Sequence, residues 1–199
     1  SSSKGCAELV ASSYRRSFLQ EQGIGLASVR AGNVIGGGDW ADDRLIPDIL
    51  RSFEKNDAVV IRNPKAIRPW QHVLEPLSGY LILAEKLYKN QKEYAEGWNF
   101  GPNEKDVKPV SWILDKMISK WPASSWELDQ NSNPHEADFL KLDISKAKAK
   151  LGWKPVWELS HTLEKIIDWH KAYLNQEDMQ TICLAEIEEY TKDMSNENR

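Results

Sequence analysis

The chain alternates between amphipathic stretches, in which apolar residues recur every three or four positions, and short runs of small and β-branched residues. Amphipathic stretches begin near residues 4, 44, 75, 110 and 158, and the short runs cover residues 25–32, 58–62, 97–101 and about 125–128. The first pattern is typical of helices that bury one face, and the second of short buried strands. This alternation predicts an α/β domain, in which ligands bind beyond the carboxyl ends of the strands.

Several local features follow from these patterns. The first helix should bury Ala7, Val10, Ala11, Tyr14 and Phe18, and the helix from residue 75 should bury Leu77, Tyr80, Leu81, Ala84 and Leu87. Ser160 is the expected N-cap of the helix near residue 158, because a serine hydroxyl can accept from free first-turn N–H groups. Gly152 is expected to end a short helix, and a last, weakly amphipathic helix is expected after residue 177, either docked or fraying.

The segment "NVIGGGDWADD" is predicted to be a mobile loop, because it is rich in glycine and aspartate. It follows a strand, yet the next helix begins only near Arg44. A phosphate-binding turn of a dinucleotide site passes at once into its helix, so this loop is a poor match for one.

Composition limits the possible partners. A net charge of −4 gives no basic face for nucleic acid, and no apolar run approaches the roughly 18 residues of a membrane span. Cys6 and Cys183 lie far apart beside apolar residues, which favours buried free thiols in a reducing compartment, the cytoplasm. The four histidines have no partners at zinc-like spacing, so no metal site is expected.

Four segments together resemble a known family: "SSSKGCAELVASSYR", "VRAGNVIGGGDWADDRLIPD", "IRNPKAIRPWQHVLEPLSGYL" and "LGWKP". They are similar to the extended short-chain dehydrogenase/reductases, the NAD-dependent epimerases and dehydratases of nucleotide sugars, and within them to dehydratases of CDP-glucose. The resemblance covers residues 1–174 and leaves 175–199 as a helical tail. It implies the C-terminal part of such an enzyme, with an incomplete Rossmann-type parallel sheet and a smaller α/β substrate-binding region.

The resemblance gives Lys4 a catalytic role. In this family a tyrosine and a lysine four residues later share one helix face, and Lys4 matches the lysine, so the tyrosine would fall directly before Ser1. A lysine in that position can favour the tyrosinate by Coulomb attraction and hydrogen-bond the nicotinamide ribose of NAD. The chain would then begin inside the active site. The alternative is that Lys4 is a solvated lysine near a helix start.

The substrate-binding candidates rest partly on residue type and partly on the resemblance. Arginine suits phosphate oxygens, and Arg44 opens a helix whose N-terminal amides also favour anions, while Arg62 lies at a strand end. The resemblance adds a diphosphate contact for Asn33 and Arg68 and a nucleotide-base contact for Leu45 and Ile46. Further pocket candidates are Asn99, His135 and Glu136. The alternatives are a solvated surface charge for Arg44 and Arg62, a turn for Asn33, a strand-end hydrogen bond for Asn99, and ordinary surface polarity for His135 and Glu136. Arg30 is at least as suited to a structural ion pair as to a ligand contact.

The implied reaction oxidises C4 of the sugar, eliminates water across C5 and C6, and reduces C6, giving CDP-4-dehydro-6-deoxyglucose for deoxysugar and polysaccharide synthesis. The full-length enzyme would be a hydro-lyase and a homodimer, and the chain alone would be inactive and prone to association. Two alternatives stay open: another epimerase or dehydratase of the superfamily, and a non-catalytic module that binds nucleotide sugars.

Overall fold

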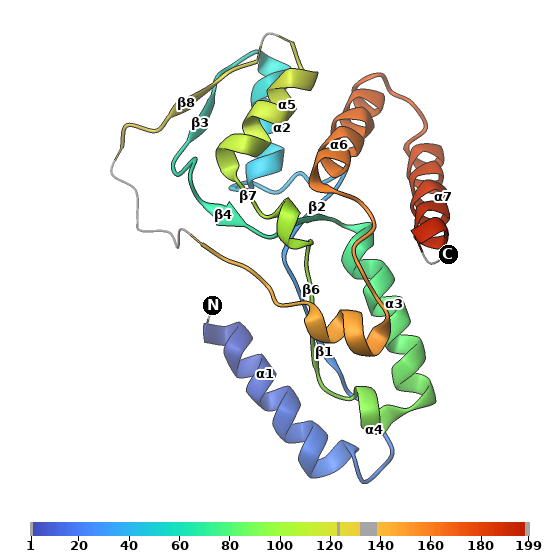
Figure 1. The fold of residues 1–199 in the computed structure, drawn as a ribbon. Helices are drawn as coiled ribbons and strands as arrows, with labels where there is room; N and C mark the ends of the chain where they lie inside the picture. Colours follow the sequence, from blue (N-terminus) through green and yellow to red (C-terminus); the bar gives the residue numbers. More distant parts are fainter. Residues whose placement is uncertain (1, 123, 132–138, 198–199) are drawn as a thin grey trace. The chain divides into compact units, whose positions relative to one another are not determined.

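The computed structural model describes residues 2–122, 124–131 and 139–197 and divides the chain into two compact units (Figure 1). Unit 1 comprises 1–31, 75–101 and 142–154, and unit 2 comprises 32–74, 102–141 and 155–199. The α-helices are α1 (Ser2–Tyr14), α2 (Leu45–Lys55), α3 (Leu74–Lys89), α4 (Gln91–Tyr94), α5 (Val110–Lys120), α6 (Leu159–Leu174) and α7 (Met179–Glu197). Short helices of other types are η1 (Arg15–Leu19), η2 (Glu104–Asp106) and η3 (Ala147–Leu151). The strands are β1 (Ser28–Ala31), β2 (Asn33–Ile35), β3 (Val59–Ile61), β4 (Ile67–Arg68), β5 (Trp70–His72), β6 (Gly97–Phe100), β7 (Lys108–Pro109) and β8 (Trp126–Leu128).

Unit 1 is built on a parallel pair of strands. Strand β1 pairs with β6, with Ser28 opposite Gly97 and Ala31 opposite Phe100. The largest side chains in its core are aromatic: Trp98 and Phe100 of β6, and Trp153, which follows η3. Gly152 ends η3 with a positive φ of 70°, the left-handed conformation that glycine adopts without strain, as the sequence predicted.

Unit 2 holds the larger core. Its strands form two parallel pairs, β2 with β5 and β3 with β8, and one antiparallel pair, β4 with β7. Helices α2, α5 and α6 bury Ile49, Phe53, Ile113, Leu114, Met117, Leu163 and Ile166 against them. The mainly parallel pairing confirms the predicted α/β class with a partial Rossmann-type sheet.

The predicted buried face of α1 is wrong. The helix is present, but Leu9, Val10 and Tyr14 are exposed by 72%, 58% and 55%, and none of its described residues is buried. Periodicity identifies an apolar face, but burial also needs a second layer to cover that face. Within the described part of unit 1 no element does so. Strand β1, expected to be buried, is likewise half exposed, with Val29 at 40%.

Helix α3 buries a different face from the one predicted. Pro76, Gly79 and Leu83 are buried, whereas Leu77 and Leu81 are exposed by 45% and 74%. Gly79 explains the choice, because a Cβ there would lie 2.3 Å from the ring of Phe100. The absent side chain therefore admits the aromatic ring of β6 and determines which side of the helix packs.

Two boundaries also differ from prediction. Strand β2 occupies the start of the expected loop, because its residues find backbone partners in β5. Helix α6 begins at Leu159 with Glu158 as its N-cap, so Ser160 lies inside the helix. The Leu159 N–H donates instead to Oδ1 of Asp106 at 3.0 Å, a cap supplied from a distant part of the chain.

The Asp106 cap makes a testable contribution to stability. Burial raises the pKa of Asp106, with Glu158 adding a smaller increase, so ionisation of this carboxyl costs stability as pH rises through its folded pKa. We expect Asp106→Asn, which keeps the acceptor oxygen without the charge, to raise the free energy of unfolding at pH 7. Asp106→Ala should lower it by about 1–3 kcal/mol, because the Leu159 N–H loses its partner. Urea unfolding at pH 7 measures both, and an Asn variant as unstable as the Ala variant would contradict this account.

Helix α7 docks on α6 within unit 2. Its Glu186 pairs with the buried His72 at 2.8 Å, its Asp193 accepts from Trp157 Nε1 at 2.9 Å, and Tyr190 is 4% exposed. Both Cys6 and Cys183 are free, as predicted, but exposed, contrary to prediction, although Cys183 Sγ accepts from Trp169 Nε1 at 3.3 Å. None of the helices described combines the length and hydropathy needed to cross a membrane.

Candidate functional site

Strand pairing in unit 2 brings two of the predicted substrate residues close together in the backbone. Asn33 opens β2 and lies opposite Trp70 of β5, and its N–H donates to the carbonyl of Pro69 at 2.9 Å. Arg68, at the end of β4, directly precedes Pro69. Asn33 and Arg68, 35 positions apart in the sequence, therefore lie close together in the backbone of this unit.

Arg68 lies beside a second cation. In the antiparallel pair β4–β7 it is directly opposite Lys108, and both residues are half-buried. Arg68 Nη1 donates to the carbonyl of Ile67 at 3.0 Å, and Lys108 Nζ lies 5.7 Å from the centre of the Trp112 ring. Two cations on one strand pair offer charge-assisted hydrogen bonds to an anion. Sequence reasoning missed Lys108, because a two-residue strand in "KDVKPV" has no periodicity to reveal it.

The loop between Asn33 and Arg44 is anchored on α6, contrary to the predicted mobility. Trp40 lies 4.8 Å from Tyr173 and 6.2 Å from Trp169 between ring centres. A Cβ on Gly37 would lie 2.3 Å from the Trp169 ring, so this glycine serves close packing, and Gly38 has a positive φ of 76°. The glycines of the segment thus let the loop approach α6. This packing holds in place the loop that joins Asn33 to Arg44.

This packing predicts a large effect for a small substitution. Gly37→Ala should lower the free energy of unfolding by about 1–3 kcal/mol, because the added methyl group has no room beside Trp169. Gly5→Ala in α1 is the matched control, since nothing lies within 4 Å of a Cβ there, and a helical alanine should be neutral or stabilising. Thermal or urea unfolding measures the difference, and equal effects of the two variants would contradict the proposed packing.

Arg44, Leu45 and Ile46 lie where α2 begins. Arg44 is the exposed N-cap residue, with φ −117° and ψ 131°, and its side chain makes no cap hydrogen bond. Leu45 is half-buried, whereas the side chain of Ile46 is 2% exposed and packs in the core. The side chain of Ile46 therefore belongs to the core, which leaves its backbone for any contact with a base. Arg62 is exposed, directly after β3.

Lys4 and Asn99 belong to unit 1. Lys4 is exposed on the first turn of α1. Glu8, one turn further along, accepts from Ser28 Oγ at 2.7 Å and from Arg30 Nε at 2.8 Å, and these hydrogen bonds hold the pKa of the Glu8 carboxyl below its usual value. Glu8 is thus committed to β1 rather than to Lys4. The Arg30–Glu8 contact is the ion pair that the sequence favoured for Arg30, although it is partly exposed rather than buried.

Asn99 has partners for both ends of its amide. Its Oδ1 accepts from Arg30 Nη1 at 3.0 Å, and its Nδ2 donates to the carbonyl of Asp143 at 3.2 Å. This strand-end network is the structural role that the sequence left open for Asn99. His135 and Glu136 lie outside the described residues; the described segment after them bridges β4 through Phe139, which pairs with Ile67.

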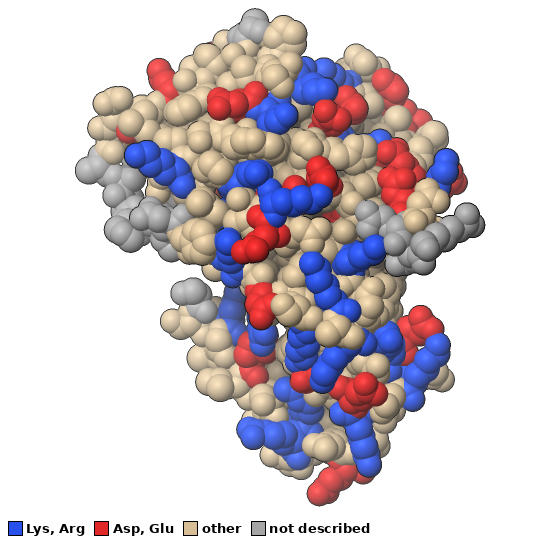
Figure 2. Space-filling model, in the orientation of Figure 1, with Lys and Arg blue, Asp and Glu red and all other residues tan. Residues whose placement is uncertain are grey.

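The structure thus brings Asn33 and Arg68 of unit 2 close together, places Arg44 and Arg62 on other elements of that unit, and describes Lys4 and Asn99 in unit 1. Figure 2 shows Lys and Arg interspersed with Asp and Glu over the visible face. On that face anion binding would depend on a few well-placed cations rather than on an overall positive field.

Comparison with known proteins extends the sequence resemblance. No family model matches the chain. It is 59% identical over 196 residues to CDP-glucose 4,6-dehydratase of Salmonella typhimurium, a match that covers 96% of this chain and 55% of that protein. It is 26% identical to UDP-glucuronic acid decarboxylase 1 of Arabidopsis thaliana, covering 88% of this chain and 38% of that one. The chain therefore spans about half, or less, of the curated relatives that it matches. The match to the dehydratase also reaches into the C-terminal tail, which the sequence resemblance was expected to leave out.

Solved structures support the fold. UDP-glucuronic acid 4-epimerase from Bacillus cereus, in complex with UDP-glucuronic acid and NAD, matches with a TM-score of 0.68 at 19% identity, covering 83% of this chain and 50% of that one. dTDP-glucose 4,6-dehydratase from Bacillus anthracis, in complex with NAD, matches with a TM-score of 0.68 at 19% identity, covering 85% and 51%. The predicted resemblance is confirmed: this chain is similar in sequence to part of CDP-glucose 4,6-dehydratase, and it has the fold of the extended short-chain dehydrogenase/reductases.

Proposed function

We propose that a protein containing this chain is an NAD-dependent hydro-lyase that converts CDP-glucose to CDP-4-dehydro-6-deoxyglucose. The observation that carries the proposal is the 59% identity to such a dehydratase over 96% of this chain. Because the chain spans 55% of that relative, the reaction is proposed for a protein that also supplies the remainder, and the chain alone is expected to be inactive.

In this proposal unit 2 binds the diphosphate. Arg68 can donate two parallel hydrogen bonds to phosphate oxygens, and Lys108 opposite it adds a second positive charge. The Asn33 side chain, held by the β2–β5 pairing, would donate to the same group, and Arg44 with the first amides of α2 would favour a second phosphate. Two cations at one strand pair match the two negative charges of a nucleoside diphosphate sugar better than they match a neutral sugar.

The residues present also fit NAD. Lys4 is exposed, and the nearest carboxylate along its helix face, Glu8, is committed to Ser28 and Arg30. The Lys4 ammonium is therefore available to hydrogen-bond a ribose and to favour an ionised tyrosine one turn before it. When bound, the nicotinamide would supply a reversible acceptor for the hydrogen removed from C4. Once C4 is a ketone, the proton on C5 becomes acidic, which makes elimination of water across C5 and C6 feasible.

An assay of the longer protein tests this function. Incubated with NAD and CDP-glucose, it should form a 4-keto-6-deoxy sugar nucleotide, detected by mass as the loss of one water. UDP-glucose and dTDP-glucose serve as matched substrates, because the choice of cytidine rests on sequence similarity. Absence of water loss with all three substrates would refute the dehydratase proposal.

A 4-epimerase is the second candidate, favoured by the similar fold of UDP-glucuronic acid 4-epimerase. It would use Lys4 and the diphosphate residues but would return the hydrogen to C4 without eliminating water. The same assay separates the two, since epimerisation leaves the mass unchanged and alters the sugar configuration. A third possibility, a module that only binds nucleotide sugars, would show binding of CDP-glucose without either product.

The proposal extends to the setting of the enzyme. We infer a cytoplasmic homodimer that acts in deoxysugar and polysaccharide synthesis. Nucleotide sugars are made in the cytoplasm, and exposed free thiols persist in a reducing compartment. Light scattering of the longer protein measures its mass in solution, and a monomer at working concentrations would contradict the dimer.

A further inference from the structure

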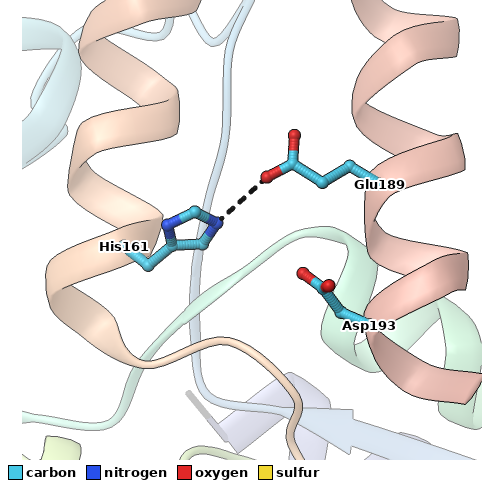
Figure 3. A group of neighbouring side chains, drawn as sticks. All are labelled: His161, Glu189 and Asp193. Atoms are coloured by element: carbon cyan, nitrogen blue, oxygen red, sulfur yellow. Dashed lines mark ion pairs between the residues drawn. The ribbon is translucent and has the colours of Figure 1, made fainter. Parts of the chain in front are cut away.

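Three side chains on α6 and α7 lie near one another, and none of them is among the candidate substrate residues (Figure 3). His161 of α6 faces Glu189 and Asp193 of α7, which are one helical turn apart and so share a face. One nitrogen or oxygen atom from each lies within 4.8 Å of the others, and His161 Nε2 is 3.4 Å from Glu189 Oε1. All three belong to unit 2. We propose that they form a binding site for a divalent transition cation of the zinc type.

The imidazole nitrogen is the first argument. His161 Nε2 is buried and, among the described residues, makes no hydrogen bond of good geometry. The 3.4 Å contact with Glu189 is too long and too poorly aligned to satisfy it. The Trp157 ring lies edge-on to the imidazole, 4.9 Å away between ring centres. A buried nitrogen aimed at two carboxylates is an unused ligand atom.

The carboxylates are held in place by donors on their other sides. Glu189 Oε2 accepts from Lys165 Nζ, and Asp193 Oδ2 accepts from Trp157 Nε1 at 2.9 Å. A carboxylate has about four acceptor positions, so one donor leaves room for a metal. Such outer partners orient ligating carboxylates in known metal sites. Trp157 is 7% exposed, so its indole is a fixed rather than a mobile donor.

The spacing suits zinc. Ligands bonded at about 2.0–2.1 Å in a tetrahedron lie about 3.3 Å apart, close to the 3.4 Å between His161 and Glu189. The Asp193 ligand atom lies within 4.8 Å of the other two, so metal binding would draw it closer to them. One nitrogen and two oxygens favour zinc-type ions over calcium or magnesium, which prefer oxygen alone. A water would complete the coordination.

Lys165 opposes metal binding, which provides a second test of the site. Its ammonium pairs with Glu189 and lies 5.9 Å from the centre of the Trp157 ring. A cation at the three ligands would be repelled by this charge and would compete for the same carboxylate. Removing Lys165 should therefore strengthen metal binding, whereas removing any ligand should weaken it.

Zinc titration by calorimetry tests the site. The protein should be metal-free, carry no polyhistidine tag, and bear Cys6→Ser and Cys183→Ser, because exposed thiols bind zinc themselves. We expect one Zn²⁺ per chain, with affinity lowered about a hundredfold by His161→Gln and raised by Lys165→Met. Glu188→Gln is the matched control, since it removes the same charge from an exposed neighbour on α7 and should change nothing.

Hydrogen exchange supplies a second measurement. A metal that joins α6 to α7 should slow amide exchange in α7 when Zn²⁺ is added, and His161→Gln should abolish that slowing. Binding that is absent, or equally strong in His161→Gln and Glu188→Gln, would overturn the proposal. Should His161→Gln fail to fold, Lys165→Met decides instead, because it removes no ligand and must still tighten binding. These results do not depend on whether the dehydratase function is correct.

Discussion

Replacing Lys4 with methionine is expected to lower NAD-dependent turnover of CDP-glucose on the order of a thousandfold in the longer protein. The substitution removes the exposed ammonium of α1 but keeps a side chain of similar length and helix propensity. Without that charge, an adjacent tyrosine would ionise less readily at neutral pH, and the ribose would lose a donor. Steady-state kinetics measures the loss in kcat.

Substrate binding should separate this effect from a general defect. The proposed contact of Lys4 is with the ribose of NAD and not with the substrate diphosphate, so CDP-glucose affinity should change by less than about threefold. Lys55→Met, which removes a lysine from the last turn of α2, is the matched control and should retain normal turnover. Full activity of the Lys4 variant would remove Lys4 from the mechanism.

The second large effect concerns the facing cations. Arg68→Met is expected to weaken CDP-glucose binding by roughly 10- to 150-fold, because hydrogen bonds to charged groups contribute about 1.5–3 kcal/mol each. Lys108→Met should weaken it less, since an ammonium contacts phosphate as a single point charge. Calorimetric titration with CDP-glucose measures both.

Stability should separate a binding role from a structural one. If Lys108 acts in substrate binding, the Lys108 variant should lose affinity while its unfolding temperature changes little, because a partly exposed charge contributes little to stability. If the two residues had only a structural role, the substitution would lower both the unfolding temperature and the affinity for CDP-glucose. Reduced stability together with unchanged affinity would refute the proposed diphosphate site.

The helices illustrate how far sequence alone could lead. The amphipathic stretch that begins near residue 44 forms α2 and buries Ile49, Leu50 and Phe53, because the same core contains residues of α5, α6 and β3 that its apolar face can meet. Helix α3 does not bury its predicted face. The Phe100 ring packs against Gly79, and this contact leaves Leu77 and Leu81 exposed. A missing side chain does not appear in a pattern of apolar residues, so periodicity predicted the helix and not its orientation.

In the candidate site too, the sequence indicated some residues, whereas others are identified only by the folded structure. Arg44 and Arg68 could be chosen from residue type, position and resemblance, but the neighbours that shape their surroundings come from pairing across the chain. Lys108 reaches Arg68 only through the β4–β7 ladder, and Gly37 meets Trp169 of a helix more than a hundred residues away. Likewise, three residues of α6 and α7 could not suggest a metal site, because their spacing in sequence follows no ligand motif.

Each unit is assembled from three separate stretches of chain, and this has a consequence for synthesis on the ribosome. Unit 2 starts at residue 32 but includes α7, whose Glu186 pairs with His72 and whose Tyr190 is buried. Its first strands therefore leave the exit tunnel long before their last partners are translated. Unit 2 should remain sensitive to protease until α7 has been translated, and chaperones should engage the nascent chain throughout that interval.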